Sequence, residues 1–140
     1  MSKGKLFNFL LVGSILFIIY LTTLPEPGLG IGVTGGSNFI PFYTMGDLLF
    51  HSSFREFVIN NIGNIILFMP FGFFLPLVFN NLGSWKKVCL VGMLLSMTIE
   101  CIQLFLPNRW TDIDDVILNT IGTGIGYCLF KLISRFLKMK

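Results

Sequence analysis

Four long apolar stretches dominate the pattern of hydrophobic and polar positions in this chain. A helix needs about 20 mostly apolar residues to cross the hydrocarbon core of a membrane. The stretches have about that length and cover residues 6–24, 57–79, 88–106 and 116–137. The first two contain no charged residue, the third carries only Glu100, and the fourth carries Lys131 and Arg135 in its last turns. The pattern therefore predicts an all-α, polytopic membrane protein with four transmembrane helices.

The connections follow from these boundaries. Residues 25–56 and 107–114 connect the first to the second and the third to the fourth helix, and the chain 1–140 forms a single membrane domain. The first connection opens with the Gly-rich segment PEPGLGIGVTGGS, which we expect to be flexible or closely wound. Its second part, TMGDLLFHSSFREF, predicts a short interfacial helix with Asp47, His51 and Arg55 on one face.

Composition supports a membrane protein and excludes two other classes. Hydrophobic residues make up 54% of the chain, charged residues make up 12%, and the mean hydropathy is +0.80. A soluble domain carries about 25% charged residues, and a disordered chain is still more polar.

The first stretch could alternatively be a cleaved signal peptide, since Lys3 and Lys5 precede it. Its length and the lack of an Ala-x-Ala exit favour a membrane span.

Basic residues predict the orientation. Eight of the ten Lys and Arg residues fall on one side of the predicted helices, which we assign to the cytoplasm together with both termini. The exceptions are Arg55 and Arg109. All seven acidic residues lie on or near the opposite, outer side: Glu26, Asp47, Glu56, Glu100, Asp112, Asp114 and Asp115. The outer face is therefore predicted to be acidic although the net charge is +3.

Three predicted helices carry amide or acid side chains at a similar depth. An ionisable or amide group costs a few kcal/mol inside a membrane, so each one needs a partner or a function. With a rise of ~1.5 Å per residue, these groups lie within roughly 5 to 10 Å of the outer interface. They are Asn60, Asn61 and Asn64 in the second helix, Glu100 and Gln103 in the third, and Asn119 in the fourth. The sequence predicts one shared polar layer beneath the outer surface.

The segment PNRWTDIDD connects the third and fourth helices directly above this layer. Asp112, Asp115 and Asn119 share one face if the fourth helix begins near Asp112, and the aspartates could also cap that helix. Arg109 could pair with Asp112 or bind a phosphate or carboxylate. Glu100 could join its helix to an asparagine of a neighbouring helix, or act as a functional group in an outward-facing cavity.

Other chemistry has weaker support. A cluster of Asp112, Asp114 and Asp115 could hold a divalent cation, although aspartates at an outer helix start are more often caps or solvated charges. His51 has no partner at metal-ligand spacing, and the three cysteines are expected to pack inside helices. No nucleophile elbow or phosphate-binding glycine loop is found in the sequence, so we expect no cofactor and no nucleic-acid partner. Gly122 and Gly126 form a GxxxG pattern, which favours close packing within the bundle or in a homo-oligomer.

Several of these segments together resemble the VanZ-like family. They are NFIPF at 38–42, NNIGNIILFMPFGFFLP at 60–76, ECIQLFLPNRWTDIDDVILNTIG at 100–122, and the GTGIGY that follows. The resemblance covers roughly residues 38–127, and its motifs occur in one order. Carried over position by position, it points to Asn38, Pro41, Asn64, Pro70, Gly72, Glu100, Gln103, Arg109, Asp112, Asp115, Asn119 and Gly122. The Gly-rich start of the first outer connection departs from the family pattern.

The resemblance implies a bacterial cell-membrane protein associated with resistance to teicoplanin-type glycopeptide antibiotics. Combined with the polar layer, it leads to a first hypothesis of an outward-facing site for a lipid-anchored ligand, either a lipoglycopeptide or a lipid-linked cell-wall precursor, among the membrane lipids. A second hypothesis is a membrane enzyme that modifies such a lipid, with Glu100 as acid or base. A third is a structural partner of envelope proteins.

Overall fold

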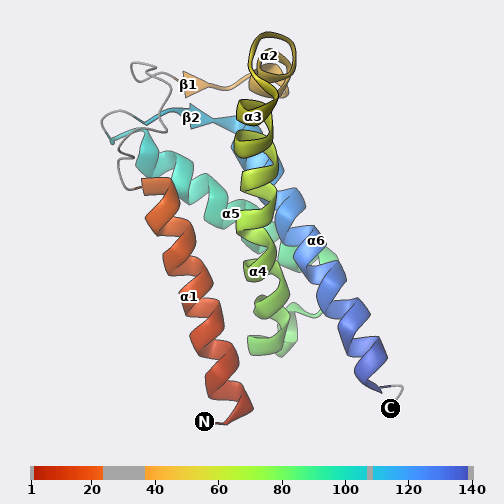
Figure 1. The fold of residues 1–140 in the computed structure, drawn as a ribbon. Coiled ribbons are helices and arrows are strands. Elements are labelled where there is room, and N and C mark those ends of the chain that lie inside the picture. Colours follow the sequence, from red (N-terminus) through yellow and green to blue (C-terminus); the bar gives the residue numbers. More distant parts are fainter. Residues whose placement is uncertain (1, 24–36, 107–108, 139–140) are drawn as a thin grey trace.

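The computed structural model describes residues 2–23, 37–106 and 109–138. In these residues four long helices run alternately up and down, so that both termini lie at the same end of the molecule (Figure 1). The elements in chain order are α1 (Lys3–Thr23), β1 (Ser37–Asn38), α2 (Tyr43–His51), α3 (Phe54–Phe57), the π-helical turn η1 (Val58–Ile62), α4 (Gly63–Val78), the 3-10 turn η2 (Asn80–Leu82), α5 (Trp85–Gln103), β2 (Thr111–Asp112) and α6 (Ile113–Lys138).

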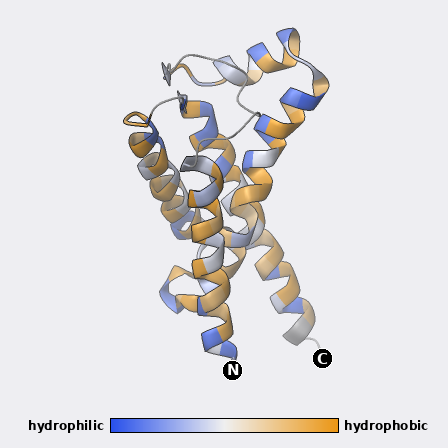
Figure 2. Ribbon diagram, turned by 60° about the vertical axis from the view of Figure 1, so that its left-hand side comes forward, coloured by the Kyte–Doolittle hydropathy of each residue, from blue (hydrophilic) through white to orange (hydrophobic). Residues whose placement is uncertain are grey.

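Three of the helical stretches are long and apolar enough to cross a membrane. They are Lys3–Thr23, Phe54–Val78 and Ile113–Phe136. Each corresponds to one of the four predicted spans, which places the protein in a membrane. The remaining predicted span corresponds to α5, which is 19 residues long and carries Lys86 and Lys87 in its first turn and Glu100 near its end. Hydrophobic residues prevail along the helices (Figure 2).

The second span is one continuous helical rod made of α3, η1 and α4. Pro70 and Pro76 both lie inside α4, and the helix ends only at Val78. The sequence analysis did not predict the π-helical turn η1, Val58–Ile62. Turns of this kind are rare and occur frequently at functional sites. Here the turn directly precedes the part of α4 that carries Asn64.

The predicted interfacial helix is present but shorter than expected. α2 ends at His51, and Ser52 is extended. The Ser53 side chain accepts a hydrogen bond from the Glu56 amide, and the Glu56 side chain accepts one from the Ser53 amide, so a capping box starts a new helix. Arg55 therefore belongs to the second span and does not continue the face formed by Asp47 and His51. The Gly-rich segment that precedes α2 lies largely outside the described residues.

Two further details correct the sequence prediction. The all-α class holds for the bundle, but β1 and β2 form a two-residue parallel bridge in which Ser37 pairs with Thr111 and Asn38 with Asp112. This bridge joins the first and second outer connections (Figure 1). In addition, α6 begins at Ile113, three residues before the predicted start of the fourth span. Asp114 and Asp115 consequently lie in the first turn of α6 and not in the loop.

Small residues allow α4 and α6 to form the most extensive helix contact in the described structure. A Cβ atom at Gly122 would collide with the backbone of Ile65, and one at Gly126 with the backbone of Met69. The GxxxG pattern is thus used for packing within the chain. The predicted contact between copies of the chain remains a prediction, and it would need another face of α6.

The apolar core lies between the helices. Its buried members come from all four long helices: Leu11, Ile18, Phe68, Phe71, Leu75, Val88, Ile99 and Tyr127. In α1 only Leu11 and Ile18 are buried, while Phe9 and Leu16 are largely exposed. An exposed apolar surface of this extent is expected for helices in contact with lipid.

Candidate functional site

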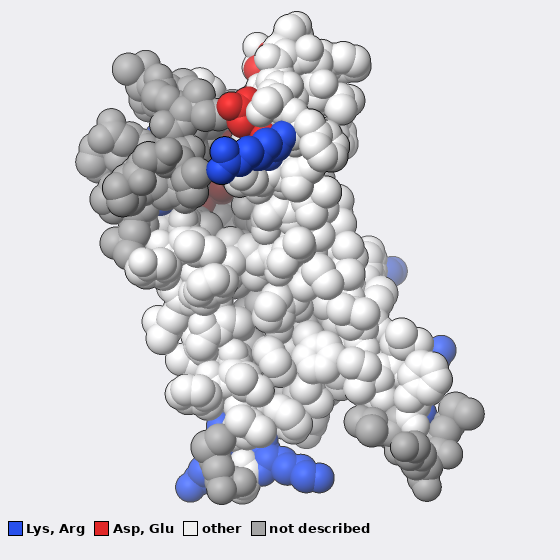
Figure 3. Space-filling view, viewed as in Figure 1, with Lys and Arg blue, Asp and Glu red and all other residues white. Residues whose placement is uncertain are grey.

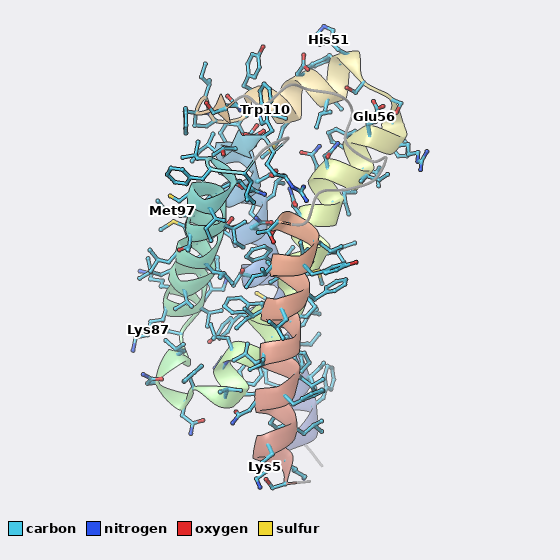
Figure 4. The ribbon with its side chains drawn as sticks, turned by 90° about the vertical axis from the view of Figure 1, so that its left-hand side faces the viewer. Lys5, His51, Glu56, Lys87, Met97 and Trp110 are labelled. Carbon is cyan, nitrogen blue, oxygen red and sulfur yellow. The ribbon has the colours of Figure 1, made fainter. Side chains whose placement is uncertain are left out.

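Acidic side chains are confined to one end of the bundle in the view of Figure 3. Basic side chains lie mainly toward the end that holds the termini, but a basic side chain also lies beside the acidic atoms at the opposite end (Figure 3). The side view gives the same division, with Lys5 and Lys87 toward one end and His51, Glu56 and Trp110 toward the other (Figure 4). Most of the predicted site residues lie at the acidic end, in α4, α5, α6 and the bridge between β1 and β2. We call the following group of side chains the polar layer: Asn38, Asn64, Glu100, Gln103, Asp112, Asp114, Asp115 and Asn119.

Glu100 connects α5 to the start of α6. Its carboxylate oxygen Oε2 accepts a hydrogen bond of 2.8 Å from the backbone amide of Asp112, and its backbone carbonyl accepts one of 3.3 Å from the Thr111 hydroxyl. Only 6% of Glu100 is exposed. The sequence left open a hydrogen bond between Glu100 and an asparagine of a neighbouring helix. In the structure, Glu100 is instead hydrogen-bonded to the backbone at the start of α6.

Asp112 and Asp114 cap two different helices. The Asp112 side chain accepts a hydrogen bond of 2.9 Å from the Asp114 amide, which is N-capping of α6 as predicted. The Asp114 carboxylate accepts hydrogen bonds from the amides of Phe42 (2.5 Å) and Met45 (3.0 Å). It therefore caps α2 from the first turn of α6. Phe42 adopts a left-handed conformation with φ 66°, which is uncommon for a bulky residue.

Two amide side chains join α6 to its neighbours. Asn64 donates a hydrogen bond of 2.6 Å to the Asp115 carboxylate, and Asn119 donates one of 2.8 Å to the Ser96 hydroxyl. Ser96 lies one helical turn from Glu100 on α5, and Asn119 lies one turn from Asp115 on α6. Asp115 is also within electrostatic range of Glu100. The predicted convergence of three helices therefore holds.

The other predicted residues attach the outer connections and α1 to this layer. Asn38 donates a hydrogen bond of 2.9 Å to Asp112 and one of 3.0 Å to Thr44. Gln103 donates one of 2.8 Å to the carbonyl of Thr22, at the end of α1. The Arg109 guanidinium donates one of 3.4 Å to the carbonyl of Leu21.

Some predicted residues lie apart from the polar layer. Asn60 is exposed and donates its hydrogen bond to the Glu56 carbonyl of its own helical rod. His51 and Asp47 form an exposed pair at 3.1 Å on α2. Among residues 2–23, 37–106 and 109–138, no group of three or more His, Cys, Asp or Glu could hold a metal ion. The three aspartates suggested for a cation instead have separate protein partners.

Sequence reasoning missed several members of the layer. Ser96, Thr22, Thr44 and Thr111 each contribute a hydroxyl or a carbonyl to it. Only Ser96 had a signal in the sequence, because it lies one turn from Glu100 on the same helix. Thr22 and Thr44 lie at helix ends and Thr111 lies in the two-residue strand β2, where spacing carries no such information.

Two apolar grooves flank α1. The first, with a volume of about 230 Å³, lies between α1 and α4 and is lined by residues including Phe9, Phe17 and Phe74. The second, of about 380 Å³, lies between α1, α4 and α5, with Ile15, Phe71, Leu95 and Thr98 among its lining residues. The volume of the second groove is within the range of small-ligand sites, and that of the first is just below it.

Comparison with known proteins agrees with these features. The chain matches the VanZ/LLP1 family over residues 9–134. It is 37% identical over 103 residues to "Protein VanZ" of Enterococcus faecium, a match that covers 74% of this chain and 57% of that protein. The chain thus spans little more than half the length of this curated relative. No solved structure matches it. The family match includes the whole polar layer and most of each long helix, and the chain belongs to the VanZ/LLP1 family.

Proposed function

We propose that the chain spans the bacterial cell membrane four times, with both termini in the cytoplasm and the polar layer facing the outside. α5, third in chain order, then also crosses the membrane, since it packs against α6 along the bundle and is 19 residues long. Lys86 and Lys87 lie at its cytoplasmic end, where positive charge is favoured. This orientation brings the acidic end to the side on which lipid-linked cell-wall precursors and glycopeptides meet.

The function proposed on this basis is reduced sensitivity to teicoplanin-type lipoglycopeptides through binding of a lipid-anchored ligand in the outer leaflet. The ligand is either the antibiotic itself or a lipid-linked cell-wall precursor. One observation carries the proposal: a buried polar layer confined to one end of an otherwise apolar bundle. Buried polar groups in a membrane are costly and mark sites of function or of helix contact. The groove between α1, α4 and α5 would take the acyl chain.

The test is a resistance assay in a susceptible Gram-positive host. The chain and its variants are expressed at equal membrane abundance, and the minimal inhibitory concentration is measured for an acylated glycopeptide and for one without an acyl chain. Glu100→Gln and Arg109→Gln test the polar layer. Leu95→Trp fills the groove, and Ile133→Trp, at an exposed position of α6, is its matched control.

The expected result is a raised inhibitory concentration for the acylated drug with the unaltered chain and with Ile133→Trp. The polar-layer and groove variants should lose most of this increase. Unchanged resistance in Glu100→Gln, Arg109→Gln and Leu95→Trp would reject the site. A similar increase for both drugs would reject recognition of an acyl chain.

A further inference from the structure

Residues 37–51, which contain β1 and α2, are attached to the bundle by polar groups. The one buried residue of this segment is Asn38, whose side chain donates a hydrogen bond of 2.9 Å to Asp112. The Asp114 carboxylate, which is almost completely buried, accepts hydrogen bonds from two backbone amides of the same segment. We call residues 37–51 the cover.

The large apolar side chains of the cover are left on its outside. Six of them are at least 58% exposed: Phe39, Ile40, Phe42, Tyr43, Leu49 and Phe50. The apolar core of the bundle contains no residue of the cover. The usual arrangement of apolar groups inside and polar groups outside is thus reversed here. An exposed apolar patch of this kind marks a surface that contacts a protein or a membrane.

Polar and apolar side chains occupy different sides of α2. Asp47 and His51 form the exposed pair at 3.1 Å. Because an α-helix has 3.6 residues per turn, Leu49 lies about 160° around the helix from both members of this pair. Phe50 lies on the same side as Tyr43, one residue position from Leu49 in the chain. A helix with separate apolar and charged sides is typical of the membrane interface.

The direction of α2 agrees with such a location. α2 lies at the acidic end of the bundle, crosswise to the long helices (Figures 1 and 4). Three of those helices are long and apolar enough to cross a membrane, so a helix crosswise at their end runs along the membrane surface. Only two residues separate α2 from the second span, which begins at Phe54. Phe54 is itself 83% exposed, so the apolar surface of the cover continues onto the lipid-facing side of this span.

We propose that the exposed apolar side of the cover is an interaction surface for the lipid bilayer, with Leu49 and Phe50 inserted among the lipid chains and with His51 directed toward water. A lipid surface fits this patch better than a protein, because the patch joins a membrane span and includes Tyr43, a residue type enriched at membrane interfaces. The inference goes beyond the proposed function, since it requires no ligand and holds for either side of the membrane.

The experiment measures which solvent surrounds each side of α2. A nitroxide is attached to Leu49→Cys, Phe50→Cys or His51→Cys in the full chain, with the three native cysteines replaced by alanine, and the protein is reconstituted in phosphatidylcholine–phosphatidylglycerol vesicles. Collision rates of the nitroxide are measured with oxygen, which concentrates in hydrocarbon, and with a water-soluble nickel chelate present on both sides of the membrane. Ile66→Cys, at an exposed position midway along the second span, gives the reference value for lipid.

The ratio of oxygen to nickel collisions should be severalfold higher at residues 49 and 50 than at residue 51, and it should approach the ratio at residue 66. A ratio at residues 49 and 50 as low as that at residue 51 would place the whole cover in water and overturn the proposal. Labels at residues 49 and 50 that are shielded from both reagents would show contact with protein, in this chain or a second copy, and would overturn it as well.

The labelled positions of α2 are exposed, so the labels require no repacking of the bundle. Thermal unfolding of each labelled chain should match that of the cysteine-free chain, and Tyr43→Cys, on the same side of α2 as Phe50, repeats the comparison with a further position. The resistance assay separates the two proposals. Lipid contact of α2 without any change in resistance rejects the proposed function alone. Resistance with a cover that lies in water rejects this inference alone.

Discussion

At the scale of single residues, each acidic side chain of the polar layer has its own structural partner. Glu100 accepts a hydrogen bond from the backbone amide of Asp112, at the start of α6, and the Asp112 side chain caps that helix. Asp114 caps α2, and Asp115 accepts a hydrogen bond from Asn64. The side chains of Asp112 and Asp114 are almost completely buried. The layer therefore stabilises this end of the bundle.

The Glu100 contact leads to a prediction about stability. Glu100→Ala should lower the free energy of unfolding by about 1–3 kcal/mol, because it leaves the buried amide of Asp112 without an acceptor. Glu100→Gln retains an acceptor and should cost clearly less. Thermal unfolding of both variants in detergent micelles, without added lipid, measures this difference. Equal stability of the two variants would show that the contact with Asp112 contributes little.

At the scale of elements, the helices could be predicted from the sequence, but the path of their outer connections could not. Uncharged runs of about 20 residues locate the spans, because the membrane requires that length. α5 nevertheless spans Trp85–Gln103, three residues earlier than its apolar run, because Ser84 caps it. The polar layer was predictable from the cost of polar groups in a membrane. Its pairings were not, since they depend on the path of two loops.

The cap on α2 gives a prediction for this element. Asp114→Ala removes the acceptor for the Phe42 and Met45 amides, so α2 should open more often while the four long helices remain intact. Hydrogen exchange measured by mass spectrometry should become faster in residues 43–51. Asp47→Ala, at the surface of the same helix, is the control and should change exchange little. Unaltered exchange in Asp114→Ala would contradict capping of α2 by Asp114.

The contact between α4 and α6 gives a second prediction at this scale. Gly126→Ala places a methyl group against the Met69 backbone and should cost about 1–3 kcal/mol of stability. Gly13→Ala on α1 is the matched control, since its Cβ would meet no atom within 4 Å. It should be neutral or slightly stabilising, because alanine favours helix formation. Equal stability losses in the two variants, compared by thermal unfolding, would contradict close packing at Gly126.

At the scale of the whole molecule, the proposed function depends on the different charge of the two ends of the bundle. Basic side chains lie mainly toward the end with both termini, and acidic atoms appear at the other end, beside a basic side chain (Figure 3). The connection between α4 and α5 lies at the basic end, and Trp110 lies at the acidic end (Figure 4). A protein that binds an outer-leaflet ligand through this layer must expose the acidic end outside the cell.

Labelling of single cysteines in intact cells tests this orientation most directly. Cys89, Cys101 and Cys128 are replaced by alanine, and Trp110→Cys or Asn81→Cys is introduced at an exposed position of each end. A membrane-impermeant maleimide should label Trp110→Cys in intact cells and Asn81→Cys only after the cells are permeabilised. Labelling of Asn81→Cys but not Trp110→Cys in intact cells would place the polar layer in the cytoplasm and contradict the account.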